Sequence, residues 1–435
     1  MAHTKGLTRR AFLGRTAGAL AAPTVITSFS LAGEDRPAPS NRITVGMVGV
    51  GGEGTKNLHA FLGQPDAQVV AVCEVDPQRM EKAHSAVETK YANDKRSGAF
   101  KGCSTTQDFR DILARDDVDA VMISTPDHWH CLISAMALRA GKDVICEKPT
   151  LTIQEGRFVA DLVKRYGAVF QTSTEDRSLA MYHRMAELVR NGRIGKLQRI
   201  YVKLPGGPDN PGDATPQPVP PGFNYEMWLG PAAWAPYTPA RIHWNFRWIW
   251  DYSGGVLTDW GAHLIDTAQW GNDTERTGPV EVEGTGKRHT TGLYNTFYEY
   301  HLCYKYASGV EMFIDSGGAA LKFEGTAGWV GNDGWTAPLQ ASSPQILKSV
   351  IGPGEIHLFT CPGGEHRNFL DCVKTRTDPY FPAEIGHRCS SVMHIGNIAM
   401  LTGRKLRWDP AAEHFVDDPG PDRLRARAMR APWRL

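Results

Sequence analysis

A glycine-rich turn between an apolar run and a helix-compatible stretch is the feature that most constrains the fold. Residues 43–48 are apolar and of strand type, residues 55–62 suit a helix, and the turn between them contains Gly49, Gly51, Gly52 and Gly54. In a Gly-x-Gly-x-x-Gly turn, the glycines permit a tight turn, a close approach to a pyrophosphate and close packing of helix on strand. The helix N-terminus presents free N–H groups to the phosphates. The sequence therefore predicts a dinucleotide site that includes these four glycines.

An acidic residue follows the next apolar run at the distance that such a unit requires. Residues 69–73 resemble a strand and end in Glu74, about 20 residues after the glycine turn, where a carboxylate accepts hydrogen bonds from the adenosine ribose. Its negative charge would repel a 2′-phosphate, which favours NAD. Arg79 could swing over a 2′-phosphate, so NADP remains an alternative.

Two further apolar runs complete the pattern of a parallel sheet. Residues 120–124 and 143–146 are of strand type and alternate with helical stretches, which favours a doubly wound α/β fold. In such sheets ligands bind beyond the C-terminal ends of the strands. Five residues at these ends are therefore expected to contact the cofactor, namely Thr125, Pro126, Trp129, His130 and Glu147.

Length and charge exclude several classes of protein. A chain of 435 residues exceeds what one hydrophobic core usually serves, so two domains are expected. With a net charge of +1, the chain has no electrostatic footprint for nucleic acid or an anionic membrane. Beyond the N-terminus it has no apolar run long enough to span a bilayer. None of the eight cysteines forms a Cys-x-x-Cys pair, and no metal site is predicted.

The N-terminus has the pattern of an export signal. A twin arginine, Arg9-Arg10, is followed by a weakly apolar run over residues 17–31 and by small residues suited to cleavage. This order indicates a Tat signal over residues 1–33 and a linker over 34–41. The sequence therefore predicts a periplasmic or otherwise extracytoplasmic protein.

The hydrophobic pattern changes after the first domain, which we place at residues 42–166. Residues 297–306 alternate between two faces with a period of two, as expected of a long antiparallel strand with one apolar face. Residues 198–204, 310–315 and 319–324 supply candidate partners. We therefore expect residues 167–435 to form an α+β domain with an open, mainly antiparallel sheet that binds substrate.

These motifs together resemble the glucose–fructose oxidoreductase/inositol dehydrogenase (Gfo/Idh/MocA) family. The resemblance rests on the glycine turn, on Thr125 to His130, on Glu147-Lys148-Pro149 and on the segment from Gly254 to His263. It implies that Lys148 binds the reacting oxygen beside the nicotinamide and that the Lys148–Pro149 bond is cis. It further implies a carbohydrate or polyol substrate and a homodimer or homotetramer formed through the second domain.

Asp259 and His263 are the candidate acid/base pair. The segment after Gly254-Gly255 has apolar residues at helical spacing, and Asp259, His263 and Asp266 share a different face. An aspartate one turn before a histidine can hold the ring and stabilise its protonated form. We interpret His263 as the general acid/base, Asp259 as its orienting partner or a substrate ligand, and Lys148 as the residue that polarises the substrate oxygen.

Substrate contacts are expected from an aromatic and basic cluster that precedes this helix. Aromatic rings stack on the C–H faces of sugars, and basic side chains bind hydroxyls or carboxylates. Most of the tryptophans in the cluster are more readily explained as core or interface. The candidate substrate residues are Tyr237, His243 and Arg247, with Arg177 as a weaker candidate after a predicted strand end.

Three functions fit these residues. The first is an NAD(P)-dependent oxidoreductase that acts on a hydroxyl of a sugar, inositol or glycoside and keeps its cofactor bound. The second is an NAD-dependent glycosidase that oxidises a hydroxyl transiently, eliminates the glycosidic substituent and returns the hydride. The third is a binding protein that kept the nucleotide fold without catalysis.

Overall fold

The computed structural model describes residues 41–435. The predicted signal and, apart from Asn41, the predicted linker lie outside these residues. No helix within the described part of the chain combines the length and the apolar character that a bilayer crossing requires.

Six strands of the described chain form a parallel sheet in the order β3-β2-β1-β4-β5-β6. This is the doubly wound order of a dinucleotide-binding domain, with its switch point between β1 and β4. The strands are β1 (Ile43–Val48), β2 (Ala67–Cys73), β3 (Ser104–Thr106), β4 (Ala120–Ile123), β5 (Asp143–Glu147) and β6 (Phe170–Ser173). The helices that connect them are α2 (Gly52–Leu62), α3 (Pro77–Lys90), α4 (Ala92–Arg96), α5 (Phe109–Leu113), α6 (Asp127–Arg139) and α7 (Ile153–Tyr166).

The boundary that we placed at residue 166 is corrected by β6. This strand pairs in parallel with β5, so the first sheet continues to Ser173. The chain also returns to this domain near its end, because α13 (Gly364–Thr375) packs Phe369 and Leu370 into the core of the first domain. Such long-range additions leave no local pattern, since an apolar helix face does not specify which sheet it covers.

The second sheet, also within residues 41–435, has nine strands in the order β13-β12-β11-β7-β10-β9-β8-β14-β15. All neighbouring strands are antiparallel except β7 and β10, which run parallel. Its strands are β7 (Leu197–Leu204), β8 (Glu281–Arg288), β9 (Phe297–Lys305), β10 (Glu311–Ser316), β11 (Ala320–Gly325), β12 (Gly328–Gly331), β13 (Gln340–Ala341), β14 (Leu406–Asp409) and β15 (His414–Phe415). The open, mainly antiparallel sheet is therefore confirmed.

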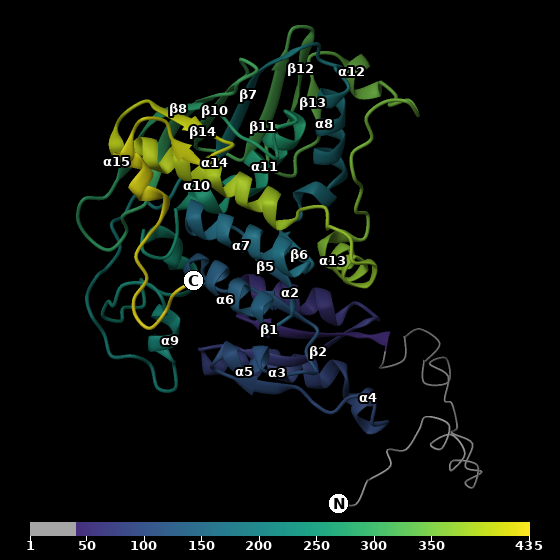
Figure 1. The fold of residues 1–435 in the computed structure, drawn as a ribbon, viewed down its shortest axis with the longest axis vertical. Coiled ribbons are helices and arrows are strands. Elements are labelled where there is room, and N and C mark those ends of the chain that lie inside the picture. The colour runs from purple at the N-terminus through teal and green to yellow at the C-terminus, as the bar shows by residue number, and fades with distance from the viewer. Residues whose placement is uncertain (1–40) are drawn as a thin grey trace, which may run out of the picture. The chain divides into compact units, whose positions relative to one another are not determined.

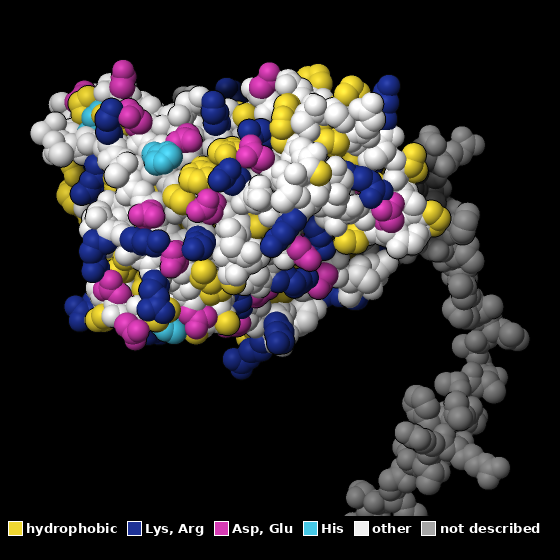
Figure 2. Space-filling view, turned by 90° about the horizontal axis from the view of Figure 1, so that it is seen from above, with side chains coloured by type: hydrophobic (Ala, Val, Ile, Leu, Met, Phe, Trp, Pro, Cys, Tyr) yellow, Lys and Arg dark blue, Asp and Glu magenta, His cyan; other side chains and the backbone are white. Residues whose placement is uncertain are grey.

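One face of this sheet is covered by helices and the other is open (Figure 1). The covering helices are α8 (Ala180–Arg190), α11 (Gly261–Gly271) and α14 (Ala383–Thr402). Along β9, Tyr300, Leu302 and Tyr304 are buried under them, whereas Glu299 and His301 are exposed. The open face carries basic, acidic and hydrophobic side chains side by side (Figure 2).

The remaining elements lie in the connections between these layers. They are α9 (Tyr225–Leu229), α10 (Val256–Asp259), α12 (Pro344–Lys348), α15 (Pro419–Asp422) and the 3-10 helices η3 (Asp176–Ser178), η4 (His243–Trp248) and η5 (Arg423–Arg425). The segment with α9 and η4 forms an aromatic cluster of its own. The C-terminal tail reaches the first domain, where Trp433 packs against Phe109 and Trp129.

Candidate active site

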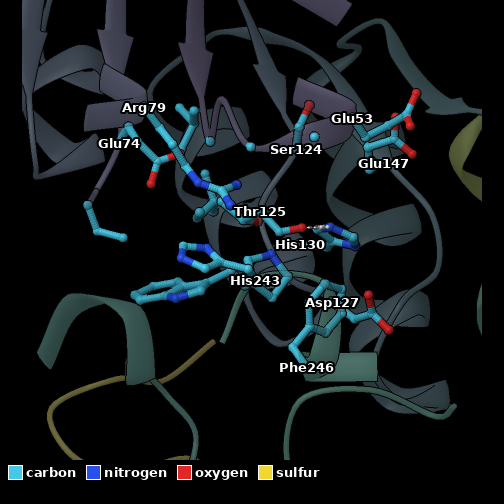
Figure 3. A pocket seen from close by; sticks show the side chains of 18 of the residues that line it. Glu53, Glu74, Arg79, Ser124, Thr125, Asp127, His130, Glu147, His243 and Phe246 are labelled. Carbon is cyan, nitrogen blue, oxygen red and sulfur yellow. Dashed lines mark hydrogen bonds between the residues drawn. The ribbon is translucent and has the colours of Figure 1, made fainter. Parts of the chain in front are cut away.

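A pocket of about 540 Å³ opens at the C-terminal edge of the parallel sheet. Its walls come from the glycine turn after β1, the ends of β2, β4, β5 and β6, the segment around η4, and residues of α11 and α13. Figure 3 shows Glu74 and Arg79 on one side of this pocket, Glu53 and Glu147 on the other, and Thr125 between them. This is where the strand order predicts a ligand.

The glycine turn has the geometry of a dinucleotide cradle. Gly49 has φ +84°, and a Cβ there would lie 2.7 Å from the carbonyl oxygen of Ser124. A Cβ on Gly54 would overlap the carbonyl of Gly49, so α2 can approach the strand only with glycine at this position. Gly51 and Gly52 line the pocket itself. The backbone N–H groups that begin α2 are therefore open to phosphate oxygens.

Glu74 and Arg79 lie together at one end of the pocket. The Glu74 carboxylate accepts hydrogen bonds from the backbone N–H groups of Val50 (2.9 Å) and Asp76 (3.1 Å), and burial raises its pKa despite these bonds. Each carboxylate oxygen keeps a further lone pair for a ribose hydroxyl. His243, predicted to bind substrate, also lies at this end, 3.8 Å from Asp76, and is therefore closer to the cofactor than expected.

The residues after β4 and β5 form the opposite end. Thr125 Oγ1 is buried without a hydrogen-bond partner, so a cofactor atom can satisfy it. Each ring nitrogen of His130 lies 2.8 Å from a carbonyl oxygen, that of Thr125 or that of Pro149. Burial lowers the pKa of His130 to about 4, so the ring is neutral and donates to only one of the two carbonyl oxygens. The Lys148–Pro149 bond is cis, as the resemblance implies.

Three other predicted cofactor residues also line the pocket. Pro126 precedes α6, and Trp129 is nearly buried and donates its Nε1–H to the carbonyl of Trp228 at 3.2 Å. Glu147 Oε1 accepts a hydrogen bond from Asn57 Nδ2 at 2.9 Å, and burial raises the pKa of Glu147. Trp129 therefore shapes the wall, whereas Glu147 can also bind a ligand hydroxyl.

Asp259 is the centre of a buried charge cluster with Lys148 and Arg247. Lys148 Nζ lies 2.9 Å from Asp259 Oδ1, and Arg247 Nε lies 2.8 Å from Asp259 Oδ2. Burial opposes ionisation of Asp259, but the two cations outweigh it and hold the pKa of this carboxyl well below its usual range. Burial opposes the charge of Lys148, but the carboxylates of Asp259 and Glu147 outweigh burial and raise the pKa of Lys148. Lys148 is therefore a protonated hydrogen-bond donor.

His263 is held by a different aspartate from the one that its spacing suggested. Its Nδ1 lies 3.4 Å from Oδ2 of Asp176, the first residue of η3, and 3.2 Å from Oγ1 of Thr174, the residue after β6. Asp259 instead binds Lys148 through Oδ1 and Arg247 through Oδ2. The expectation that Asp259 orients His263 is therefore wrong.

The environment of His263 favours a strong base. Burial and the charge of Lys148 lower its pKa, but the carboxylates of Asp176 and Glu175 outweigh them, so the pKa of the ring is raised. Trp335 holds the carboxylate of Asp176 in place beside His263, since Trp335 Nε1 donates to Asp176 Oδ1 at 3.0 Å. With Nδ1 engaged, Nε2 is left for a substrate proton.

Two predicted substrate residues lie elsewhere. Arg177 is buried and pairs with Asp266 (2.6 Å) and Glu275 (2.7 Å), so it stabilises the second domain. Tyr237 is buried against the rings of Phe223 and Tyr225 and does not line the pocket. An arginine after a strand end and an aromatic side chain in a loop look the same in a sequence whether they face a pocket or a core.

Sequence reasoning missed Asp176, Asp127 and Glu365. Asp127 lines the pocket and is buried with Oδ2 unpartnered, and burial raises its pKa to about 7. Glu365 reaches the pocket from α13, where burial and the nearby Glu147 carboxylate raise its pKa well above its usual value. Asp127 and Asp176 had a usable signal, because each follows a strand that ends at the cofactor edge of the sheet, whereas Glu365 had none.

The same structure contains one group with metal-ligand spacing among residues 41–435. Ligand atoms of Glu175, Asp176 and His263 lie within 4.8 Å of one another. These atoms could hold a cation. The 3.4 Å contact between His263 Nδ1 and Asp176 Oδ2 forms a histidine–carboxylate pair without a cation, although Asp176 Oδ2 has no hydrogen-bond partner among the described residues.

The fold and the pocket define a protein with a Rossmann domain of the NAD-binding class. The family model "Oxidoreductase family, NAD-binding Rossmann fold" matches residues 43–174, and "Oxidoreductase family, C-terminal alpha/beta domain" matches residues 210–435. The second match alone covers more than half of the chain. The chain therefore belongs to the Gfo/Idh/MocA family.

Relatives and solved structures agree with this assignment. The "Glycosyl hydrolase family 109 protein 2" of Shewanella sp. (strain ANA-3) is 32% identical over 161 residues, which are 36% of this chain and 34% of the relative. The chain thus spans about a third of the length of such curated relatives. The WlbA dehydrogenase of Bordetella pertussis, in complex with NADH and UDP-GlcNAcA, has a TM-score of 0.62 at 16% identity, covering 84% of this chain and 98% of that one. The aldose-aldose oxidoreductase of Caulobacter crescentus has a TM-score of 0.61 at 17% identity over 84% and 99%.

Proposed function

We propose that this protein oxidises or reduces a hydroxyl of a sugar, inositol or glycoside with a tightly held NAD. The observation that carries the proposal is that Lys148 and His263, which come from different domains, line one pocket with the glycine turn. Their charges are close enough for Lys148 to lower the pKa of His263. An ammonium donor and an imidazole base beside a nucleotide cradle are what alcohol oxidation needs.

The residues of the pocket fit NAD. Positions 49 and 54 require glycine on steric grounds. Thr125 Oγ1 is a buried polar atom without a hydrogen-bond partner in the described part of the chain. Glu74 would bind the adenosine ribose, Arg79 lies beside the turn where the pyrophosphate is expected, and Glu147 would bind at the nicotinamide end. When bound, NAD supplies the hydride acceptor.

The protein's own residues then handle the substrate oxygen and its proton. Lys148, fixed by Asp259, donates a hydrogen bond to the reacting hydroxyl and stabilises negative charge that develops on its oxygen. Nε2 of His263 takes the hydroxyl proton, and Asp176 stabilises the imidazolium that forms. In the reverse direction the same ring returns the proton to the oxygen.

An NAD-dependent glycosidase is the second candidate. The names of the curated relatives, which are glycosyl hydrolase family 109 proteins, favour it. The same three side chains would serve, since transient oxidation of one hydroxyl acidifies the neighbouring C–H and permits elimination of the glycosidic substituent before the hydride returns.

Export and self-association complete the proposal. The twin-arginine pattern at residues 9–10 supports translocation of the folded protein, and an exported enzyme must retain and regenerate its own cofactor. The open sheet face, where the rings of Tyr201 and Phe313 stack at 5.6 Å among charged neighbours, supports a homodimer or homotetramer. Fractionation of cells and sedimentation analysis of the purified protein test these two points.

One set of assays separates the candidate functions. The purified protein is denatured to identify any bound nucleotide, and the native protein is incubated with free sugars, inositols and glycosides. A rise in reduced-nicotinamide absorbance supports the oxidoreductase, whereas release of aglycone without a net absorbance change supports the glycosidase. Ligand binding with neither signal would contradict both and leave a non-catalytic binding protein.

A further inference from the structure

Trp244 is an exposed tryptophan in the wall of the catalytic pocket. Trp244 is 61% exposed although it lines the pocket, whereas Trp228, which also lines it, is buried. Tryptophan carries a large apolar surface, and leaving it in water forgoes stabilisation from burial. An exposed tryptophan at the rim of a pocket therefore points to a ligand.

One face of the Trp244 ring is held by the catalytic charge cluster. The guanidinium of Arg247 lies 4.1 Å from the centre of the Trp244 ring and 4.7 Å from that of Phe246, so it lies against both rings. The same guanidinium binds Asp259, which binds Lys148. Trp244 is thus separated from the Lys148–Asp259 pair by a single side chain. Since Arg247 covers one face and the ring is largely exposed, the other face is open to solvent.

The backbone turns sharply to place this ring at the rim. His243, the residue before it, has φ +55°, a left-handed conformation that costs about 1 kcal/mol or more in a residue with a side chain. His243 also lines the pocket, at the end where Glu74 and Arg79 lie. The turn therefore puts His243 on the cofactor side and Trp244 beside the charge cluster.

We propose that the open face of Trp244 is a second binding subsite, which stacks on the ring attached to the reacting sugar. This inference rests on the proposed function and narrows its substrate to a glycoside, in which the sugar at Lys148 and His263 carries another sugar or an aromatic group. A flat indole binds the C–H face of a sugar or an aromatic ring, and Arg247 keeps the indole in place before the ligand arrives.

The experiment compares Trp244→Ala with the wild-type protein on pairs of substrates. For each of glucose, galactose and N-acetylgalactosamine, kcat/KM is measured for the methyl glycoside and for the 4-nitrophenyl glycoside. The ratio of the two values within one protein is then compared between proteins, so that differences in intrinsic reactivity cancel. We expect Trp244→Ala to lower kcat/KM about tenfold on the nitrophenyl glycoside of the preferred sugar and less than twofold on the methyl glycoside.

Two variants serve as controls. Trp244→Phe keeps a flat ring and should recover most of the loss. Trp234→Ala removes a tryptophan that is 67% exposed but does not line the pocket. This variant should leave kcat/KM on both glycosides unchanged. Bound nucleotide is quantified in each protein after denaturation and should not differ.

Several results would overturn the subsite. Equal losses on both glycosides, an effect of Trp234→Ala as large as that of Trp244→Ala, or loss of nucleotide from Trp244→Ala would each show that Trp244 does not bind a second ring. If the wild-type protein turns over no glycoside of the panel but oxidises a free sugar or an inositol, the subsite fails alone. If it turns over none of these compounds, the proposed function fails and the subsite fails with it. If the wild-type protein turns over the glycosides and Trp244→Ala leaves the ratio of the two kcat/KM values unchanged, only the subsite is refuted.

Discussion

Asp176 Oδ2 lies 3.4 Å from His263 Nδ1, and this contact joins η3, which follows the last strand of the first sheet, to a helix under the second. Asp176 is fully buried, and its other oxygen accepts a hydrogen bond from Trp335. The pairing fixes the orientation of the imidazole and raises its pKa. The acid/base chemistry of the site therefore depends on both domains.

Asp176→Asn should shift the pH profile towards acid. The neutral imidazole is the base, so kcat/KM for oxidation rises with pH through the pKa of His263, which Asp176 raises. Loss of this carboxylate lowers that pKa, which moves the acid limb to lower pH, and the weaker base reduces the plateau about tenfold or more. A profile of kcat/KM from pH 5 to 9 measures both effects. An unchanged acid limb would contradict the dyad.

Lys148→Ala and His263→Ala should each reduce turnover about a hundredfold or more, with nucleotide still bound. In the proposed mechanism Lys148 donates to the reacting oxygen and His263 takes its proton, so neither is needed to hold the dinucleotide at the glycine turn. Turnover is measured on the preferred substrate, and nucleotide is quantified after denaturation. Lys164→Ala and His59→Ala, which alter exposed side chains outside the pocket, are the matched controls. Wild-type rates in either pocket variant would refute the mechanism.

Glu74→Gln should move cofactor preference towards NADP. The change removes the negative charge that repels a 2′-phosphate and keeps an oxygen that can accept from the backbone, and Arg79 lies nearby as a cation. We expect the ratio of NADP to NAD affinity to rise about tenfold, which corresponds to ~1.4 kcal/mol. Titration calorimetry of nucleotide-free protein measures this ratio. Glu53→Gln, at the opposite end of the pocket, should leave it unchanged, and an equal shift there would argue against the assignment of Glu74.

Arg177→Met should destabilise the protein without acting on substrate binding. The buried carboxylate of Asp266 and the partly exposed one of Glu275 would lose their cation, and breaking a buried pair such as Arg177–Asp266 costs about 3–5 kcal/mol. Thermal unfolding should show Tm lower by roughly 10 °C, while KM of the folded fraction stays the same. A raised KM with an unchanged Tm would instead support a role of Arg177 in substrate binding.

Asp127→Asn should stabilise the protein more at pH 8 than at pH 5. Burial raises the pKa of this carboxyl from its usual 3.8 to about 7, so the folded protein keeps a proton that the unfolded chain releases. Stability is therefore lost as the pH rises from about 4 to 7, and a neutral amide removes this loss. Between pH 5 and 8 the gain in unfolding free energy should grow by about 2.6 kcal/mol. Denaturant unfolding at the two pH values tests this, and an equal effect at both would mean that Asp127 is ionised throughout.

The sequence by itself determined the local units of this protein. The sequence predicted the glycine turn between β1 and α2 and the buried strands, because each of these depends on residues that are neighbours in the chain. It also predicted the alternation along β9, since a period of two places every second side chain on one face. The placement of Thr125, Glu147 and Lys148 at one edge followed from the parallel order of the strands.

Only the tertiary structure decided which charged groups meet. Asp259 lies four residues from His263 yet pairs with Lys148, 111 residues away, and His263 pairs with Asp176 instead. Arg177, in the same short segment as Asp176, points into the core rather than the pocket. A buried charge is stable only beside an opposite charge, and the partner that it finds depends on how two domains pack, which spacing along one helix does not encode.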